Sequence, residues 1–186
     1  MIKLKTIDYD INYLSTKSTT VDITSEDIES LFKPLKEYAI LNNLYGISGV
    51  SLGILKRIIY FYEPMINPVI LKKTGLTASW ENCINTSNYI GLMKRPYKIE
   101  VEYYNIKGEI IHKTFEGIDS THFMHLYDHI NGNLILDNSL VTFNMLTSDQ
   151  ISFKRSHPYR ILSTTGDYVD LMQDHNLYLT KKLTKD

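Results

Sequence analysis

Three histidines lie in one short segment, and two of them have the spacing of metal ligands. His125 and His129 are four residues apart, so on a helix their imidazoles project from one face and can reach a single metal ion. The alternative is that both are ordinary core residues, because HxxxH pairs also arise by chance. His122 comes three residues before His125 and is expected at the solvent edge of that face.

Cys83 is the one cysteine of the chain and a further candidate for chemistry. A free cysteine is often simply a small buried apolar residue, and that alternative stays open for Cys83 taken alone. Together with two imidazoles, a thiolate completes a three-ligand set that leaves a fourth position open, as a catalytic zinc or iron site requires. The residue types therefore predict a metal centre.

The histidines lie in a segment with helix signals at both ends. Residues 118–130 combine an acidic first turn with Asn131 and Gly132 at the end, which predicts a helix. A second helix is predicted over 24–43, where apolar residues recur at helical spacing after a polar start. Pro34 is expected to kink this helix or to split it into two pieces.

Strands are predicted where β-branched and aromatic residues gather or alternate with polar ones. In 98–104 apolar and charged residues alternate, and 105–108 turns this segment into a hairpin with 109–115. The first twenty residues show no sustained period and are expected to form an extended arm or a short strand. The other predicted strand segments are 57–62, 67–71, 134–136, 151–153 and 159–162, with a turn at 164–167.

Length and charge limit the classes of protein to consider. The 186 residues are 43% hydrophobic and 22% charged, which fits one domain with a real core. Twenty Lys plus Arg against twenty-one Asp plus Glu leave a net charge of −1, so charge gives no reason to expect a nucleic-acid or membrane partner. One cysteine, and no sign of a signal peptide or a membrane span, lead us to expect a cytoplasmic protein.

Ordered motifs within residues 24–137 resemble those of the peptide deformylases, which remove the formyl group from the initiator methionine of nascent chains. GISGVS at 46–51, followed by GILKRII at 53–59, resembles the motif GxGLAAPQ. ENCIN at 81–85 resembles EGCLS, and HLYDHING at 125–132 resembles HExDH with the turn that follows it. INPVI at 66–70 and KRP at 94–96 resemble the strand and the basic turn between these motifs.

The resemblance implies an α+β fold, with mixed or antiparallel sheets around a central metal-binding helix. Residues 138–186 have no counterpart in it and are expected to form a C-terminal extension of the single domain. By the same resemblance, Cys83, His125 and His129 would bind one Fe²⁺ or Zn²⁺. Arg95 and Asp128 would pair and brace the metal-binding helix, although an ordinary surface ion pair is the alternative.

The residue after His125 departs from the family pattern. Leu126 stands where the family carries a glutamate that moves a proton between water and the leaving amine. Tyr127 and Asp128 are close in sequence, but on a helix they point in other directions. Glu81, which the resemblance places at the substrate pocket, is then the one candidate to take over, although the family uses that glutamate structurally.

The substrate pocket itself also carries changes. The resemblance places it beside Gly46 and Gly49, between the glycine loop and the metal-binding helix. Ser51 replaces the glutamine that donates a hydrogen bond to the oxyanion, and loss of such a donor costs roughly 10²- to 10³-fold in rate. The backbone N–H of Ile84 could still serve as a donor, whereas Asn82 replaces a glycine and changes the shape of the loop.

These departures favour a scaffold that has lost catalysis and acts as a binding or structural protein, with a retained metal that stabilises the fold. A protein partner is expected, with a role in phage assembly or in the phage particle. The alternative is an active metal-dependent hydrolase that removes the N-formyl group from formyl-Met peptides. An accidental match, with the histidines in the core, is the third interpretation.

Overall fold

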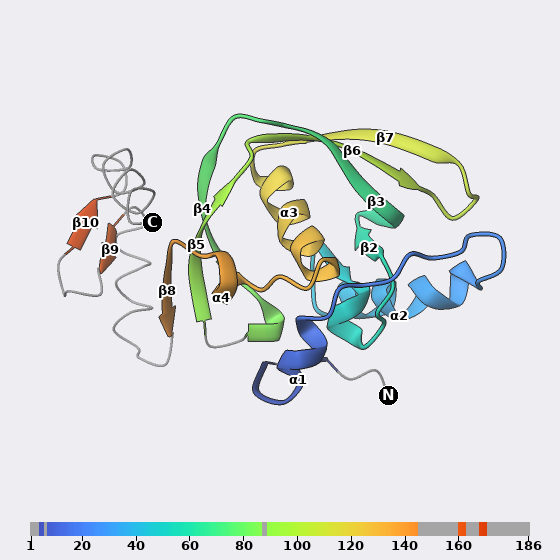
Figure 1. Cartoon of the computed structure of the whole chain (residues 1–186), viewed down its shortest axis with the longest axis horizontal. Helices are drawn as coiled ribbons and strands as arrows, with labels where there is room; N and C mark the ends of the chain where they lie inside the picture. The colour runs from blue at the N-terminus through green and yellow to red at the C-terminus, as the bar shows by residue number, and fades with distance from the viewer. Residues whose placement is uncertain (1–3, 6, 87–88, 145–159, 163–167, 171–186) are drawn as a thin grey trace.

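The computed structural model describes residues 4–5, 7–86, 89–144, 160–162 and 168–170. Helix α3 (Ile118–Ile130) lies at its centre, with antiparallel sheets on either side (Figure 1). One sheet has five strands in the order β1-β2-β3-β6-β7, and another has three in the order β4-β5-β8. The predicted α+β class is therefore confirmed.

The strands of the five-stranded sheet are β1 (Gly46–Ser48), β2 (Ile58–Phe61), β3 (Glu63–Thr74), β6 (Lys98–Tyr104) and β7 (Ile110–Glu116). Those of the three-stranded sheet are β4 (Thr77–Asn82), β5 (Tyr89–Arg95) and β8 (Val141–Asn144). Two short 3₁₀ helices, η1 (Gly49–Leu52) and η2 (Ile84–Thr86), follow β1 and β4. A further antiparallel pair joins β9 (Arg160–Leu162) to β10 (Tyr168–Asp170).

The β6–β7 hairpin confirms the prediction from alternation. Ile99, Val101 and Tyr103 are buried along β6, while the residues between them are partly exposed. In the turn, Asn105 accepts hydrogen bonds from two backbone N–H groups with its side-chain oxygen, and Gly108 adopts φ +78°.

Helix α2 (Ile28–Leu41) begins after Asp27, whose side chain accepts a hydrogen bond from the N–H of Ser30. Pro34 was expected to kink this helix or to split it into two pieces, and the split was wrong, because the helix is continuous through that residue. Proline removes one backbone donor, but Phe32 and Leu35 are buried on either side of it and anchor both halves of the helix to one core.

Two other local predictions were wrong. The first twenty residues contain a helix, α1 (Ile7–Leu14), whose last residue is fully buried in the main core. Residues 134–136 enter a helical turn, α4 (Ile135–Asn138), because the carboxylate of Asp137 accepts the N–H of Leu134. In both segments a few buried contacts, rather than a periodic pattern, decide the structure.

The remaining predicted segments have mixed outcomes. Residues 57–62 and 67–71 correspond to β2 and to part of β3, and 159–162 overlaps β9. The segment 151–153 and the turn at 164–167 lie outside the described residues. Sequence reasoning missed β4 and β5, and β8, in the expected extension, pairs with β5.

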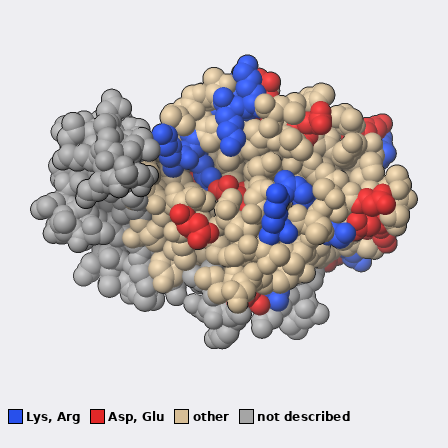
Figure 2. Space-filling model, in the orientation of Figure 1, with Lys and Arg blue, Asp and Glu red and all other residues tan. Residues whose placement is uncertain are grey.

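The main core surrounds α3. Phe61, Phe115 and Phe123 pack ring against ring between the helix and the five-stranded sheet. Figure 2 shows positive and negative side chains together on one face, in keeping with the balanced composition. Within the described part of the chain, no helix is both long and apolar enough to cross a membrane.

Candidate metal centre

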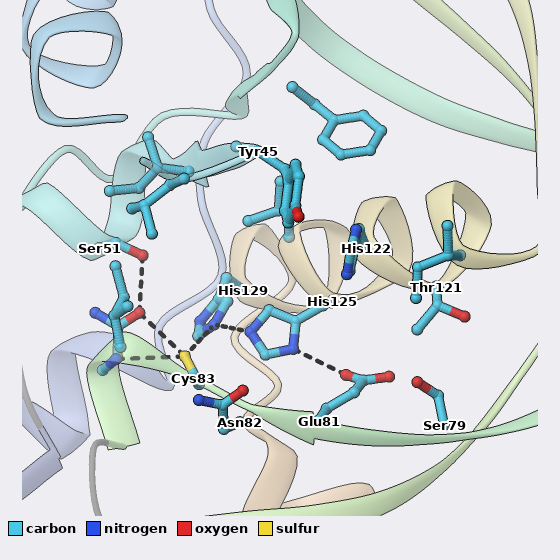
Figure 3. Close-up of a pocket in the computed structure, with 18 of the residues that line it drawn as sticks. Tyr45, Ser51, Ser79, Glu81, Asn82, Cys83, Thr121, His122, His125 and His129 are labelled. Atoms are coloured by element: carbon cyan, nitrogen blue, oxygen red, sulfur yellow. Dashed lines mark hydrogen bonds and ion pairs between the residues drawn. The ribbon is translucent and has the colours of Figure 1, made fainter. Parts of the chain in front are cut away.

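Cys83, His125 and His129 converge in space although they come from different elements. Cys83 follows the last residue of β4, and the two histidines lie one turn apart on α3. The Cys83 sulfur is 3.1 Å from Nε2 of His129, which is 3.3 Å from Nε2 of His125. Ligand atoms of all three lie within 4.8 Å of one another (Figure 3). The sequence prediction that these residues meet is therefore correct.

The electrostatics of this group suit a cation. Burial raises the pKa of the Cys83 thiol, but the imidazoles of His129 and His125 outweigh burial and hold that pKa well below its usual range. Burial likewise disfavours a charged His125, yet the Cys83 sulfur and Glu81 raise its pKa to about 10. Once a metal ion displaces the proton from His125, a thiolate and two converging imidazole nitrogens are a donor set that fits one Zn²⁺ or Fe²⁺ and leaves a position open.

A buried ion-pair network holds helix α3, which carries the two candidate histidine ligands, against β4 and β5. The Arg95 guanidinium makes two hydrogen bonds of 2.7 Å to the Glu81 carboxylate and one of 2.5 Å to Asp128. Glu81 also contacts Nδ1 of His125 at 2.8 Å, which fixes the orientation of that ring. The Arg95 side chain is only 4% exposed, so this is not an ordinary surface ion pair.

The network keeps Glu81 ionised. Burial alone raises the pKa of Glu81, but the hydrogen bonds from Arg95 and His125 outweigh it and lower the pKa below its usual value. Both carboxylate oxygens are engaged, so Glu81 is poorly placed to give or take a proton during a reaction. Its arrangement is that of a structural brace.

A pocket of about 300 Å³ opens beside the three candidate ligands. It is lined by Gly46, Glu81, Asn82 and Ile84, among others. The sequence led us to expect the first two. Gly49 is not among the lining residues, and a side chain there would press against Ile58. Of the pocket residues expected from sequence, Gly46 and Glu81 are therefore brought to the pocket and Gly49 is not.

Leu126 lines the pocket as an apolar, 9% exposed side chain. It packs against the glycine loop so closely that a Cβ at position 46 would come within 2.7 Å of Leu126 Cδ1. The neighbouring Asp128 is paired with Arg95, and Tyr127 packs against the main core. No neighbour on α3 thus presents a carboxylate in place of the missing glutamate.

Ser51 reaches the pocket, but its hydroxyl is engaged within the protein. It donates a hydrogen bond of 2.9 Å to Oδ1 of Asn85 and lies 3.1 Å from the Ser48 hydroxyl. Ser51 is 2% exposed and Asn85 is 1% exposed. Asn85 ends the second motif, and nothing in its type or spacing identified it as part of the site.

Two aromatic rings form another wall of the pocket, and sequence reasoning missed one of them. Tyr45 stacks on His122 with ring centroids 5.0 Å apart and planes 15° apart (Figure 3). Burial lowers the pKa of His122 and favours the neutral ring. His122 thus lines the pocket beside the candidate metal ligands, and the position of Tyr45 directly before the glycine loop was the available signal.

Comparison with known proteins places this geometry in a family. The family model described as polypeptide deformylase matches residues 3–142. A peptide deformylase of Karelsulcia muelleri is 30% identical over 149 residues, covering 74% of this chain and 79% of that protein. Peptide deformylase 2 of Clostridium acetobutylicum is 32% identical over 131 residues, covering 67% and 87%.

Solved structures agree with the sequence relatives. Peptide deformylase from Thermotoga maritima superposes with a TM-score of 0.68 at 24% identity, covering 75% of this chain and 97% of that chain. The deformylase of the Vibrio parahaemolyticus bacteriophage VP16T, crystallised with actinonin, gives 0.66 at 28% identity, covering 72% and 99%. The chain belongs to the peptide deformylase family of metal-dependent hydrolases.

Proposed function

We propose that this chain binds one divalent metal through Cys83, His125 and His129, receives a peptide N-terminus in the adjacent pocket, and has lost efficient deformylation. The observation that carries the proposal is the apolar Leu126 side chain in the pocket wall. The carboxylates beside it, those of Glu81 and Asp128, are already paired with Arg95. Ser51, at the second altered position, is likewise hydrogen-bonded inside the protein.

The residues present support binding better than turnover. Bound Fe²⁺ or Zn²⁺ would act as a Lewis acid and would lower the pKa of a water molecule at the open position. Glu81 holds the His125 ring in place, so the ligand geometry is maintained. What α3 lacks directly after His125 is the carboxylate that would deliver a proton to the departing amine, a step worth typically 10²- to 10⁴-fold.

A binding or structural role in contact with another protein is the biological part of this proposal. We place that role in phage assembly or in the phage particle, within a bacterial host. The phage deformylase among the similar structures supports it only to the extent that the family occurs in phages. Purification of particles from an infected host, followed by mass spectrometry of their proteins, tests this part directly.

The catalytic part is tested by hydrolysis of formyl-Met-Ala-Ser. The protein is loaded anaerobically with Fe²⁺ or Ni²⁺, its metal content is measured, and it is compared with Leu126→Glu. Leu126→Gln is the matched control, because it has nearly the same shape without the ionisable group. We expect a silent wild type and Leu126→Gln, and at least about a 10²-fold gain in Leu126→Glu.

The second candidate function is active deformylation, which the converged ligands and the open pocket favour. Under that alternative the metal-loaded wild type turns over formyl-Met-Ala-Ser, and Leu126→Glu adds little. Such a result would overturn the proposal that Leu126 marks lost catalysis. It would leave the metal site itself in place.

A further inference from the structure

Asn85 joins the candidate metal ligand Cys83 to two distant parts of the chain. Its backbone N–H points at the Cys83 sulfur at 3.4 Å, and its side-chain oxygen lies 3.4 Å from the same sulfur. That oxygen also accepts a hydrogen bond from Ser51, while the side-chain nitrogen donates to the carbonyl of Lys5 at 2.7 Å. The residue is 1% exposed, so water does not compete for these contacts.

The chemistry of the partners fixes which way the Asn85 carboxamide is turned. The Lys5 carbonyl can only accept, so the NH₂ end must face it, and the oxygen end must face Ser51 and the sulfur. The backbone N–H of Lys5 in turn donates to the carbonyl of Ser51 at 2.9 Å. Residue 5, the loop that carries Ser51 and the turn after Cys83 are thereby tied together at one side chain.

This tie bears on the geometry of the metal centre. The turn after Cys83 is only the short η2, which by itself gives little rigidity. The two histidines are held separately, by the regular backbone of α3 and by Glu81 on His125. The buried hydrogen bonds from Arg95 reach Glu81 and Asp128 rather than Cys83. The contacts that brace the Cys83 sulfur come instead from Asn85.

We propose that Asn85 is a positioning residue that holds the Cys83 sulfur at the distance from the two imidazoles that a bound metal requires. The proposal rests on the metal-binding part of the proposed function. A Cys83 thiolate carries no S–H, so a metal-bound Cys83 makes no hydrogen bond to the Asn85 oxygen. The backbone N–H of Asn85 remains as a donor to the sulfur, held in place by the bonds to Ser51 and Lys5.

The test uses the full chain loaded anaerobically with Co²⁺. The near-ultraviolet absorption from the thiolate to Co²⁺ reports the sulfur bond, and excess chelator gives the rate of Co²⁺ loss. Asn85→Ala removes the side-chain bonds to Ser51 and Lys5 but keeps the backbone N–H that faces the sulfur, and Ser51→Ala removes one of those side-chain bonds. Ser48→Ala is the matched control, because Ser48 is as buried as Ser51 but its hydroxyl contacts the Ser51 hydroxyl rather than Asn85.

We expect Asn85→Ala to lose Co²⁺ about 10- to 100-fold faster than the wild type, the usual effect of removing a group that orients a ligand, and to weaken or shift the thiolate band. Ser51→Ala should lie between Asn85→Ala and the wild type, and Ser48→Ala should stay within about twofold of the wild type. If Asn85→Ala does not fold, the comparison of Ser51→Ala with Ser48→Ala decides, and equal rates overturn the proposal.

Urea unfolding of the metal-free variants separates positioning from general stability. A merely structural Asn85 would lower the urea midpoint but leave the thiolate band and the rate of Co²⁺ loss unchanged, and that result overturns the proposal. A wild type that shows no thiolate band would instead overturn the metal-binding part of the proposed function. The two failures are therefore distinguishable.

Discussion

The two sides of the pocket differ in the polarity of their side chains. The ligand side, made of Cys83, His125, His129 and Glu81, consists of charged or polar groups that contact one another at 2.8 to 3.3 Å. The other side, which we call the loop side, is made of Gly46 and Ser51 from the glycine loop and of Leu126 from α3. It is neutral, and Leu126 packs against the glycine loop through apolar contacts.

Under the proposed function, this difference explains how the candidate metal site persists although catalysis has been lost. On the ligand side each polar group depends on a buried partner, so one substitution leaves another charge unpaired. At Leu126 on the loop side an apolar side chain of similar size satisfies the packing, so a conservative change there is expected to cost little stability. Stability and activity are therefore expected to respond separately on the two sides.

The largest effect on stability is expected at Arg95. Arg95→Ala leaves the carboxylates of Glu81 and Asp128 without their buried cation, which typically costs about 3 to 5 kcal/mol. The free energy of unfolding in urea measures the loss. The control is Lys113→Ala, because its ion pair with Glu63 is about 40% exposed and should be worth at most about 1 kcal/mol. Equal losses in the two variants would contradict the comparison.

A smaller effect is expected at Leu126 in the metal-free protein. Leu126→Gln places an amide in an apolar wall, which costs about 1 to 3 kcal/mol if the amide finds no partner there. Leu126→Met keeps the volume and the apolar character, and should cost less than about 1.5 kcal/mol. Thermal and urea unfolding of both variants measure the difference. A Leu126→Gln protein as stable as Leu126→Met would mean that the loop side already tolerates a polar group.

Local patterns were enough to predict the elements that carry the histidines. The ends of α3 and the alternation in β6 depend on residues adjacent in sequence, and both were predicted with the right bounds. The candidate ligands were likewise predicted, because four-residue spacing on a helix fixes where His125 and His129 point. The thiol was joined to them by residue type, because a thiolate and two imidazoles complete a three-ligand set, and the family resemblance implied the same three residues.

The features that sequence missed depend on contacts between distant residues. Strand β4 has a largely polar sequence and becomes a strand by pairing with β5. The tie at Asn85 joins residues separated by 34 and 80 positions, so no spacing rule could reveal it. The predicted split at Pro34 was wrong for the same reason, because the residues that keep the helix continuous on both sides of it are held by tertiary contacts with the core.

The smallest predicted effect concerns the ion pair between Glu63 and Lys113 on the five-stranded sheet, away from the pocket. Burial raises the pKa of Glu63, but hydrogen bonds from Lys113 and Tyr103 outweigh it, so the pKa is lowered from its usual value of 4.5. A lowered carboxylate pKa adds stability above the unfolded value, and that stability is lost as the pH falls through the folded value. Because Glu63 is 43% exposed, the contribution should be below about 1 kcal/mol.

Glu63→Gln measures this contribution as a difference between two pH values. At pH 7 the variant should be slightly less stable than the wild type in urea, and the gap between the two midpoints should shrink as the pH falls through the lowered pKa of the folded Glu63 carboxyl, because the wild-type carboxylate is then protonated. The same measurement on Arg95→Ala should show a several-fold larger gap at pH 7, since its carboxylates are buried. If both variants show equal gaps at pH 7, burial is not what makes the ligand side of the pocket sensitive to substitution.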